Sequence, residues 1–364
     1  MKAGIVGLPN VGKSTLFNCL SNAKAQSANF PFCTIEPNIG VVNVPDKRLE
    51  RLEELVNPQQ VIPATVEIVD IAGLVKGASK GEGLGNQFLG NIRETDAILH
   101  VLRCFDNENV VHVDGSVDPT RDKETIDMEL QLKDLESVEK KLDKVKRAAK
   151  TGNKEAQKEA ETLNSVKEGL ESGQSVRAIK LSDEAYLDYV KPMQLITDKP
   201  VMYVCNVDEA AAAEGNAYVK KVMETVKDEN AEVIFLAVGM EADITELETY
   251  EERQMFLEDL GLSEPGSAKL IRGAYSLLDL ETYFTAGEKE VRAWTIKKGA
   301  TAPQAAGVIH TDFEKGFIRA EVISYKDYVT YESEAKVKEA GKIRVEGKEY
   351  IVQDGDVMHF RFNV

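Results

Sequence analysis

The sequence predicts an α/β fold with a long helical insertion and a smaller α+β unit at its C-terminal end. Short apolar runs alternate with segments of helical periodicity in the first part of the chain and again beyond residue 200. Between these regions, a stretch rich in Lys, Glu, Ala and Leu has the spacing of a helical hairpin. From residue 279 to the end, short runs of alternating apolar and polar residues indicate strands.

The first element is an apolar run, Ala3 to Val6, which leads into Gly7-Leu8-Pro9-Asn10-Val11-Gly12-Lys13-Ser14. This segment fits the pattern G-x-x-x-x-G-K-[ST], and leucines at helical spacing predict a helix from Lys13 onward. Gly7 and Gly12 allow backbone angles that direct several N–H groups towards the α- and β-phosphates of a nucleotide. Lys13 can reach the β- and γ-phosphates, and the Ser14 hydroxyl can ligate Mg²⁺. The alternative is a Gly-rich turn with an exposed lysine.

The next segment, Ala23 to Asn38, is polar and has neither helical nor strand periodicity, so we expect a mobile loop. Thr34 is its available hydroxyl, which can supply a second Mg²⁺ ligand when the γ-phosphate is present. The alternative for Thr34 is an ordinary surface threonine. Ile39 to Val44 then indicates a strand, and Asp46 caps a helix that runs through Leu55.

A second motif follows the strand expected at Thr65 to Val69. Asp70 ends this apolar run beside the phosphate loop, which is the Walker B arrangement, and it would hold the Mg²⁺ shell through water. In Asp70-Ile71-Ala72-Gly73, the N–H of Gly73 can sense the γ-phosphate. The Gly-rich run from Gly73 to Gly85 predicts a second switch loop.

The residue that orients the attacking water is not evident after this motif. Leu74 stands where many such enzymes carry glutamine, and its side chain forms no hydrogen bond. A helix at Asn86 to Thr95 and a strand at Ala97 to Leu102 then lead to a loop that contains His112, whose imidazole could serve. The alternatives are a surface-loop histidine without a role, and water held by backbone groups alone.

A helical hairpin is expected at Lys123 to Lys150 and Lys154 to Glu171, joined near Thr151-Gly152-Asn153. It interrupts the nucleotide domain, because the next strand, Val201 to Cys205, belongs to the same sheet. One end of the hairpin is basic, so it either contacts an acidic partner or is a solvated helix face. The basic residues are Lys140, Lys141, Lys144, Lys146, Arg147 and Lys150.

The tetrapeptide Asn206-Val207-Asp208-Glu209 follows that strand at the position of the guanine-reading motif N-K-x-D. Glu209 is one methylene longer than the aspartate of the motif, and Val207 has no ammonium to lie over the base. The Asn206 amide can still pair with purine N7 and N6, so ATP is at least as plausible as GTP. Backbone groups of Ala237-Val238-Gly239 would reach the base edge. Three further elements are expected at Tyr218 to Lys227 (helix), Glu232 to Ala237 (strand) and Pro265 to Leu278 (helix).

The remaining residues predict a small β-grasp-like or related α+β unit, because short alternating strands are combined with one or two short helices. Aromatic residues Trp294, Phe313 and Phe317 have basic neighbours in the sequence, and such a face can hold RNA. The alternative is a set of core aromatics with scattered surface charge. The basic residues concerned are Arg292, Lys297, Lys298, Lys315 and Arg319.

Composition limits the kinds of binding partner and the cellular compartment that we expect for the protein. A formal charge of −17 over 364 residues argues against sequence-independent binding to nucleic acid over the whole surface, so we expect no DNA partner. No apolar run approaches a membrane span, and the N-terminus lacks the anatomy of a signal peptide. The four cysteines and four histidines show no metal-binding spacing, so we expect buried thiols in a reducing, cytoplasmic compartment.

Several of these motifs together resemble the YchF subfamily of Obg-related P-loop nucleotide hydrolases, over essentially the whole chain. The phosphate loop and the Leu74 that follows the second motif are the most specific features. The remaining segments that carry the resemblance are Pro31 to Asn38, Gly81 to Asn86, Asn206 to Glu209 and Gln353 to Phe362.

The resemblance implies a Ras-like nucleotide-binding domain at residues 1–122 and 199–278, a helical coiled-coil insertion at 123–198, and a TGS domain at 279–364. By the family pattern, Ser14 and Thr34 ligate Mg²⁺, and the base meets Asn206 and Val207, with Glu209 beside them. The family's histidine in a Val-His-Val context maps to His112. The phosphates are bound by Asn10, Val11, Gly12, Lys13, Ser14 and Thr15.

The function expected from sequence and resemblance together is a slow Mg²⁺-dependent ATPase that acts as a nucleotide-dependent switch on ribosomes or their subunits, with GTP bound more weakly. RNA contacts would come from the TGS and helical parts of the chain. One rival is a GTP-specific, translation-linked GTPase. The other is an RNA- or ribosome-binding scaffold in which the nucleotide has a structural role.

Overall fold

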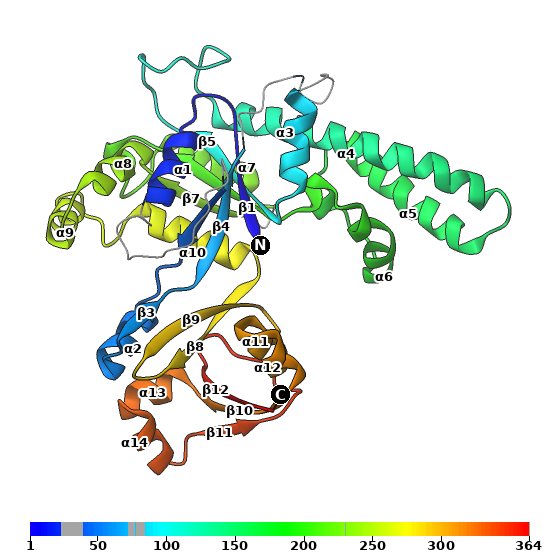
Figure 1. Ribbon diagram of the computed structural model, residues 1–364. Coiled ribbons are helices and arrows are strands. Elements are labelled where there is room, and N and C mark those ends of the chain that lie inside the picture. Colours follow the sequence, from blue (N-terminus) through cyan, green and yellow to red (C-terminus); the bar gives the residue numbers. More distant parts are fainter. Residues whose placement is uncertain (23–38, 72–76, 78–83, 230, 364) are drawn as a thin grey trace. The chain divides into compact units, whose positions relative to one another are not determined.

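The computed structural model describes residues 1–22, 39–71, 77, 84–229 and 231–363 (Figure 1). Thr34, Gly73 and Leu74, and most of the two loops expected to act as switches, lie outside the described residues. Contacts divide the chain into two compact units. The first contains residues 1–40 and 67–270, and the second contains residues 41–66 and 271–364.

The first unit is built on a six-stranded sheet in the order β2-β4-β1-β5-β6-β7. Strands β4, β1, β5, β6 and β7 run parallel to one another. Every residue of β5 and β6 is buried, as in sheets covered on both faces. The strands are β1 (Lys2–Val6), β2 (Ile39–Asn43), β4 (Thr65–Asp70), β5 (Ala97–Arg103), β6 (Val201–Asn206) and β7 (Glu232–Leu236).

Helices connect these strands, as parallel strands require. The predicted helices after the phosphate loop, before β5 and before β7 are confirmed within a few residues at each end. Two helices between residues 238 and 259 were not predicted. The helices are α1 (Lys13–Asn22), α3 (Leu84–Arg93), α7 (Ala217–Val226), α8 (Val238–Glu246), α9 (Tyr250–Asp259) and α10 (Gly266–Leu277).

The helical hairpin is confirmed as α4 (Pro119–Ala149) and α5 (Lys154–Glu171), joined by a turn with Gly152 at φ +85° (Figure 1). It begins four residues earlier than the expected Lys123, because Asp118 caps the helix and Pro119 occupies its first turn. Leucines and valines of both helices form the core of the hairpin. Short helices then lead to β6: η1 (Val176–Ala178), α6 (Asp183–Ala185), η2 (Tyr186–Val190), η3 (Lys191–Met193) and η4 (Ile196–Asp198).

The second unit has its own six-stranded sheet, in the order β11-β10-β12-β8-β9-β3. Its strands are β3 (Gln60–Ile62), β8 (Leu280–Ala286), β9 (Glu290–Lys297), β10 (Phe317–Ile323), β11 (Arg344–Glu346) and β12 (Val357–Phe362). Its helices are α2 (Lys47–Val56), α11 (Ala302–Ile309), α12 (Thr311–Lys315), α13 (Tyr325–Tyr331) and α14 (Glu334–Glu339).

Residues 41–66 belong to this second unit, although the sequence analysis placed them in the first domain. Strand β3 pairs in parallel with β9, from Gln60 opposite Glu290 to Ile62 opposite Arg292. Arg48 on α2 is ion-paired with Asp354, 2.7 Å away in the C-terminal part of the chain. The segment between β2 and β4 therefore contributes a strand and a helix to the C-terminal fold.

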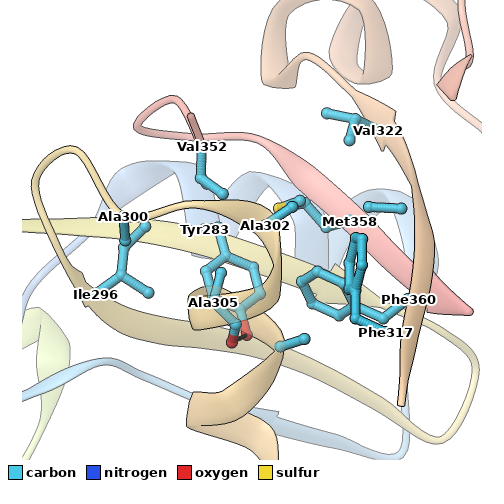
Figure 2. Packing of buried hydrophobic residues seen from close by; sticks show 12 residues of the cluster. Tyr283, Ile296, Ala300, Ala302, Ala305, Phe317, Val322, Val352, Met358 and Phe360 are labelled. Atoms are coloured by element: carbon cyan, nitrogen blue, oxygen red, sulfur yellow. Dashed lines mark hydrogen bonds between the residues drawn. The ribbon is translucent and has the colours of Figure 1, made fainter. Parts of the chain in front are cut away.

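The core of the second unit is a cluster of 12 buried hydrophobic residues (Figure 2). Tyr283, Phe317 and Phe360 lie within it, and Tyr283 meets Phe360 edge to face with ring centroids 5.7 Å apart. Alanines of α11 allow this helix to pack closely against the strands. Phe317 is therefore a core residue, as in the alternative to an RNA-binding face given in the sequence analysis.

Trp294 is partly buried and makes its contacts within the fold. Its indole Nε1 donates to Thr285 Oγ1 at 2.9 Å, and the Arg292 guanidinium lies over the ring, 3.8 Å from its centroid. Phe313 stacks on Phe362 with centroids 3.7 Å apart. The ring contacts therefore lie mainly within the fold. None of the described helices is long and apolar enough to span a bilayer.

Candidate nucleotide-binding site

The candidate site lies at the carboxyl ends of the parallel strands of the first unit. Strand β1 has β4 on one side and β5 on the other, and β6 is next in order. The phosphate loop follows β1, Asp70 ends β4, and Asn206 ends β6. Since parallel strands end at the same edge of a sheet, these three segments converge where open α/β sheets bind their ligands.

Close backbone approaches explain the two glycines of the phosphate loop. A Cβ on Gly7 would lie 2.5 Å from the Val101 carbonyl oxygen, and one on Gly12 would lie 2.5 Å from Asn206 Nδ2. Gly12 has φ +98°, and Asn10 has φ +62°, a left-handed conformation that asparagine tolerates better than most residues. The loop is thus shaped by backbone conformations that few other residues adopt.

Lys13 is the cation of this loop. In the structure its ammonium group donates to the Leu8 carbonyl at 2.6 Å, and its side chain is buried. Burial lowers the pKa of Lys13 from 10.5 to about 8, although the nearby carboxylate of Asp70 acts in the opposite direction. The buried ammonium charge of Lys13 is only partly balanced by Asp70, so the negative charge of a polyphosphate would stabilise it.

The residues expected to hold Mg²⁺ fit a hard divalent cation. Ser14 Oγ donates to Asp70 Oδ2 at 3.3 Å, so the hydroxyl and the carboxylate lie together at the loop. Asp70 Oδ1 is buried and has no hydrogen-bond partner among the described residues. Burial raises the pKa of Asp70, while the Ser14 hydroxyl and Lys13 oppose the shift. An unsatisfied buried oxygen beside a hydroxyl is a donor set that Mg²⁺ accepts directly or through water.

Asn206 joins three parts of the candidate site. Its Nδ2 donates to the Val11 carbonyl at 3.0 Å, and its Oδ1 accepts from the Val238 N–H at 3.1 Å. Val238 begins α8, so Asn206 satisfies a helix N-terminus from a distant strand. One amide hydrogen and one lone pair of Asn206 are left for a base. Val238 and Gly239 form the start of α8, and a contact of their backbone with the base edge stays a prediction.

The other two base-facing residues lie in different environments. Val207 is 3% exposed, and its backbone N–H donates to Leu236 O at 3.0 Å, so its side chain is covered by protein. Glu209 is exposed at the start of the short helix η5 (Glu209–Ala211), which Asp208 caps. Thr15 is exposed, like Ser14, on the first turn of α1.

His112 is buried rather than a surface-loop residue. Its Nε2 lies 2.8 Å from Asp122 Oδ2, and its Nδ1 accepts from the Asp114 N–H at 3.1 Å. The adjacent Val111 carbonyl accepts a hydrogen bond of 3.2 Å from Asn10 Nδ2, so the loop that carries His112 contacts the phosphate loop. The structure therefore places His112 close in the chain to a direct contact with the nucleotide-binding segment.

A metal ion is not required to explain the cluster around His112. Ligand atoms of His112, Asp114 and Asp122 lie within 4.8 Å of one another. However, the Arg121 guanidinium lies 3.0 Å from Asp122 and 3.8 Å from Asp114, so it already supplies a positive charge there. We interpret the cluster as a hydrogen-bonded network.

Helix α4 contributes contacts that the sequence analysis missed. Asp122 and Arg121 lie on its first turns, and Glu129, one heptad after Asp122, accepts from the Gly77 N–H at 2.6 Å. Gly77 belongs to the Gly-rich run expected to be a switch loop. The Asp118-Pro119 pair is a helix-start signal that would have extended α4 to these residues.

Comparisons with known proteins follow the same division of the chain. A family model described as "50S ribosome-binding GTPase" matches residues 2–142, and a YchF-type C-terminal model, described as "Protein of unknown function (DUF933)", matches residues 280–363. Proteins named "Ribosome-binding ATPase YchF" from Bacillus subtilis and Escherichia coli O157:H7 are each 57% identical to the chain, covering all of it and 99–100% of the relative. The chain belongs to the YchF family.

The fold agrees with this membership. A solved structure titled "Structure of the Schizosaccharomyces pombe YchF GTPase" is 40% identical, has a TM-score of 0.89, and covers 99% of this chain and 97% of that chain. The chain therefore has the YchF arrangement of a P-loop GTPase-type domain, a helical region and a C-terminal domain. The resemblance stated from the sequence motifs is confirmed.

Proposed function

We propose that the protein is a Mg²⁺-dependent nucleoside triphosphatase that prefers ATP to GTP and works on the ribosome or its subunits. The observation that carries the proposal is the phosphate loop with its buried Lys13, beside the Ser14–Asp70 pair and its unsatisfied carboxylate oxygen. Relatives that match the whole chain are named ribosome-binding ATPases, which supports the same activity here.

The preference for ATP rests on the residues after β6. A guanine-specific site needs an aspartate that accepts from N1–H and the 2-amino group, and this chain has Glu209 there, exposed at the start of a short helix. Val207 replaces the lysine of that motif and is buried. The free N–H of Asn206 can donate to purine N7, and its remaining lone pair can accept from the adenine 6-amino group.

In the proposed reaction, water attacks the γ-phosphate in line with the leaving oxygen. Backbone N–H groups of Val11, Gly12 and Lys13 would hold the phosphates, and the Lys13 ammonium would stabilise the charge that develops. Ser14, Asp70 and Thr34 would hold Mg²⁺, which would neutralise charge on the phosphate oxygens. We propose that His112 orients the water, since Leu74 cannot, and that the Gly73 N–H senses the γ-phosphate.

The ribosome is the proposed partner, and the basic turn of the helical hairpin is a surface that ribosomal RNA could contact. Lys140, Lys144 and Lys150 are exposed near this turn. Nucleotide state would act through the loops around Thr34 and Gly73. We also propose that the C-terminal unit contacts RNA. Of the three aromatic residues first considered for this contact, Phe313 is the one retained.

Four experiments test the proposal. Calorimetry should show ATP binding at least tenfold tighter than GTP binding in the presence of Mg²⁺, and tenfold tighter GTP binding would overturn the base argument. Lys13→Ala should abolish turnover. His112→Ala should lower the turnover number while ATP affinity stays within about twofold. Co-sedimentation with ribosomes should depend on nucleotide, and indifference to nucleotide would favour the scaffold.

A further inference from the structure

The loop that carries His112 is attached to helix α4 by a buried side-chain pair. The side chains of His112 and Asp122 are 5% and 1% exposed, and their Nε2 and Oδ2 atoms lie 2.8 Å apart. In so little contact with water, a hydrogen bond of this length fixes the orientation of both groups. The pair is formed within the first unit, between a loop and the first turns of α4.

The hydrogen bonds of the imidazole assign its tautomer. The backbone N–H of Asp114 can only donate, so Nδ1 of His112, which lies 3.1 Å from it, carries no proton. The single proton of the neutral ring is therefore on Nε2, which donates to the Asp122 carboxylate. Nδ1 is left as the nitrogen with a lone pair.

The carboxylate of Asp122 is itself fixed in place. Its Oδ1 accepts from Arg121 Nη2 at 3.0 Å, and Arg121 also donates to the Ser116 carbonyl at 2.6 Å. The Asp122 N–H donates to Asp118 O at 3.0 Å, which places the residue within the first turns of the helix, where the dipole favours a negative group. Asp122 therefore has one oxygen on Arg121 and one on His112.

Only one of the two imidazole nitrogens is suited to hold water. The Nε2–Asp122 bond is short and buried, whereas the bond to Nδ1 is longer and comes from a backbone group two residues away, within the same loop. The His112 side chain is 5% exposed, so water reaches Nδ1 only when the Asp114 N–H gives up this bond. The loop contacts the phosphate loop, because the Val111 carbonyl accepts from Asn10.

We propose that Asp122 is the positioning residue for His112. It keeps the proton on Nε2 and leaves Nδ1 as an acceptor for the attacking water. This inference rests on the proposed role of His112 in hydrolysis. Asp122 does not touch the nucleotide, and it acts through the imidazole, in the manner of the aspartate that orients the histidine in a serine-protease triad.

Asp122→Asn reverses this hydrogen bond with almost no change in volume. An asparagine that donates its amide hydrogen to Nε2 drives the proton to Nδ1, which removes the acceptor. The proposal predicts a turnover number lower by about 10- to 100-fold, the range typical of a partner that orients a functional histidine. The KM for ATP should stay within about twofold.

The experiment combines ATP turnover with histidine ¹⁵N spectra of the full chain. The signals of His112 are identified by their loss in His112→Ala, and they should show an Nε2–H ring in the wild type and an Nδ1–H ring in Asp122→Asn. Asp143→Asn is the matched control, because Asp143 is exposed on the same helix, and it should change neither the spectrum nor the turnover.

Each outcome decides something. An unchanged turnover number in Asp122→Asn, while His112→Ala loses activity, would overturn the positioning role and leave the proposed function intact. Full activity in His112→Ala would overturn the role of His112 and this inference with it. Should Asp122→Asn not fold, Asp122→Ala removes the acceptor that holds the ring without adding a donor. The Asp114 N–H still favours the Nε2–H form there, and the turnover number should show an intermediate loss because the ring is no longer oriented. Full turnover in that variant would refute the proposal.

Discussion

Replacing Asn206 by alanine tests how the candidate site is held together before any nucleotide binds. The Asn206 amide donates to the Val11 carbonyl and accepts from the Val238 N–H, and the residue is 5% exposed. Asn206→Ala therefore leaves one buried acceptor and one buried donor without partners. Each such group costs about 1–3 kcal/mol, so we expect the first unit to lose about 2–6 kcal/mol of stability in the absence of nucleotide.

Urea unfolding followed by circular dichroism, without nucleotide, measures this loss. Hydrogen exchange adds a local readout, because the Val238 amide should exchange faster once its acceptor is gone. Asn18→Ala is a suitable control, since Asn18 is exposed on α1. If the unfolding free energy of Asn206→Ala stays within about 0.5 kcal/mol of the wild type, and Val238 keeps its protection, the reasoning is refuted.

Three further predictions concern the same sheet and its loop. Gly12→Ala should abolish ATP binding measured by calorimetry, because its Cβ meets Asn206 Nδ2 at 2.5 Å, whereas Gly152→Ala, with a similar positive φ and open space, should bind normally. At pH 9 Lys13, whose pKa is about 8, is mostly neutral, and the phosphates of ATP should restore its charge, so binding should take up nearly one proton. Calorimetry in two buffers with different ionisation enthalpies measures this uptake. Binding without proton uptake would contradict a contact between Lys13 and the phosphates. Burial lowers the pKa of His100 to about 3, so the unfolded state alone gains this proton between pH 6.5 and 3, and stability falls as the pH falls. Between pH 7 and pH 5, the free energy of unfolding of the wild type should fall by about 2 kcal/mol more than that of His100→Phe, as measured by urea unfolding. An equal pH dependence of the two proteins would contradict this.

Much of the nucleotide-binding half could be predicted because its signals are local. A strand, a Gly-rich turn and a helix N-terminus occupy consecutive residues around Gly12, and the apolar runs that became β4, β5 and β6 need no partner to be recognised. The three cysteines that the structure describes, Cys19, Cys104 and Cys205, are buried as expected. Each of these features depends on neighbours in the sequence.

The features that could not be predicted depend on residues far apart in the chain. Asn206 and Val11 are 195 positions apart, and nothing local to either one indicates that they are bonded. The assignment of residues 41–66 to the second unit is of the same kind, because their pattern shows a strand and a helix but not the sheet they join. Helix α9 was a different case: Thr249 and Glu252 form a capping box that the sequence already contained.

Helix α4 has a mechanical consequence. Its 31 residues at about 1.5 Å each form a rod roughly 46 Å long. The first half of the helix carries Asp122, which is hydrogen-bonded to His112, and Glu129, which accepts from the Gly77 N–H. Lys146 and Arg147 lie in its last turn. Because one helix makes both contacts, we expect a displacement of the first half of α4 to reach His112 and Gly77 together.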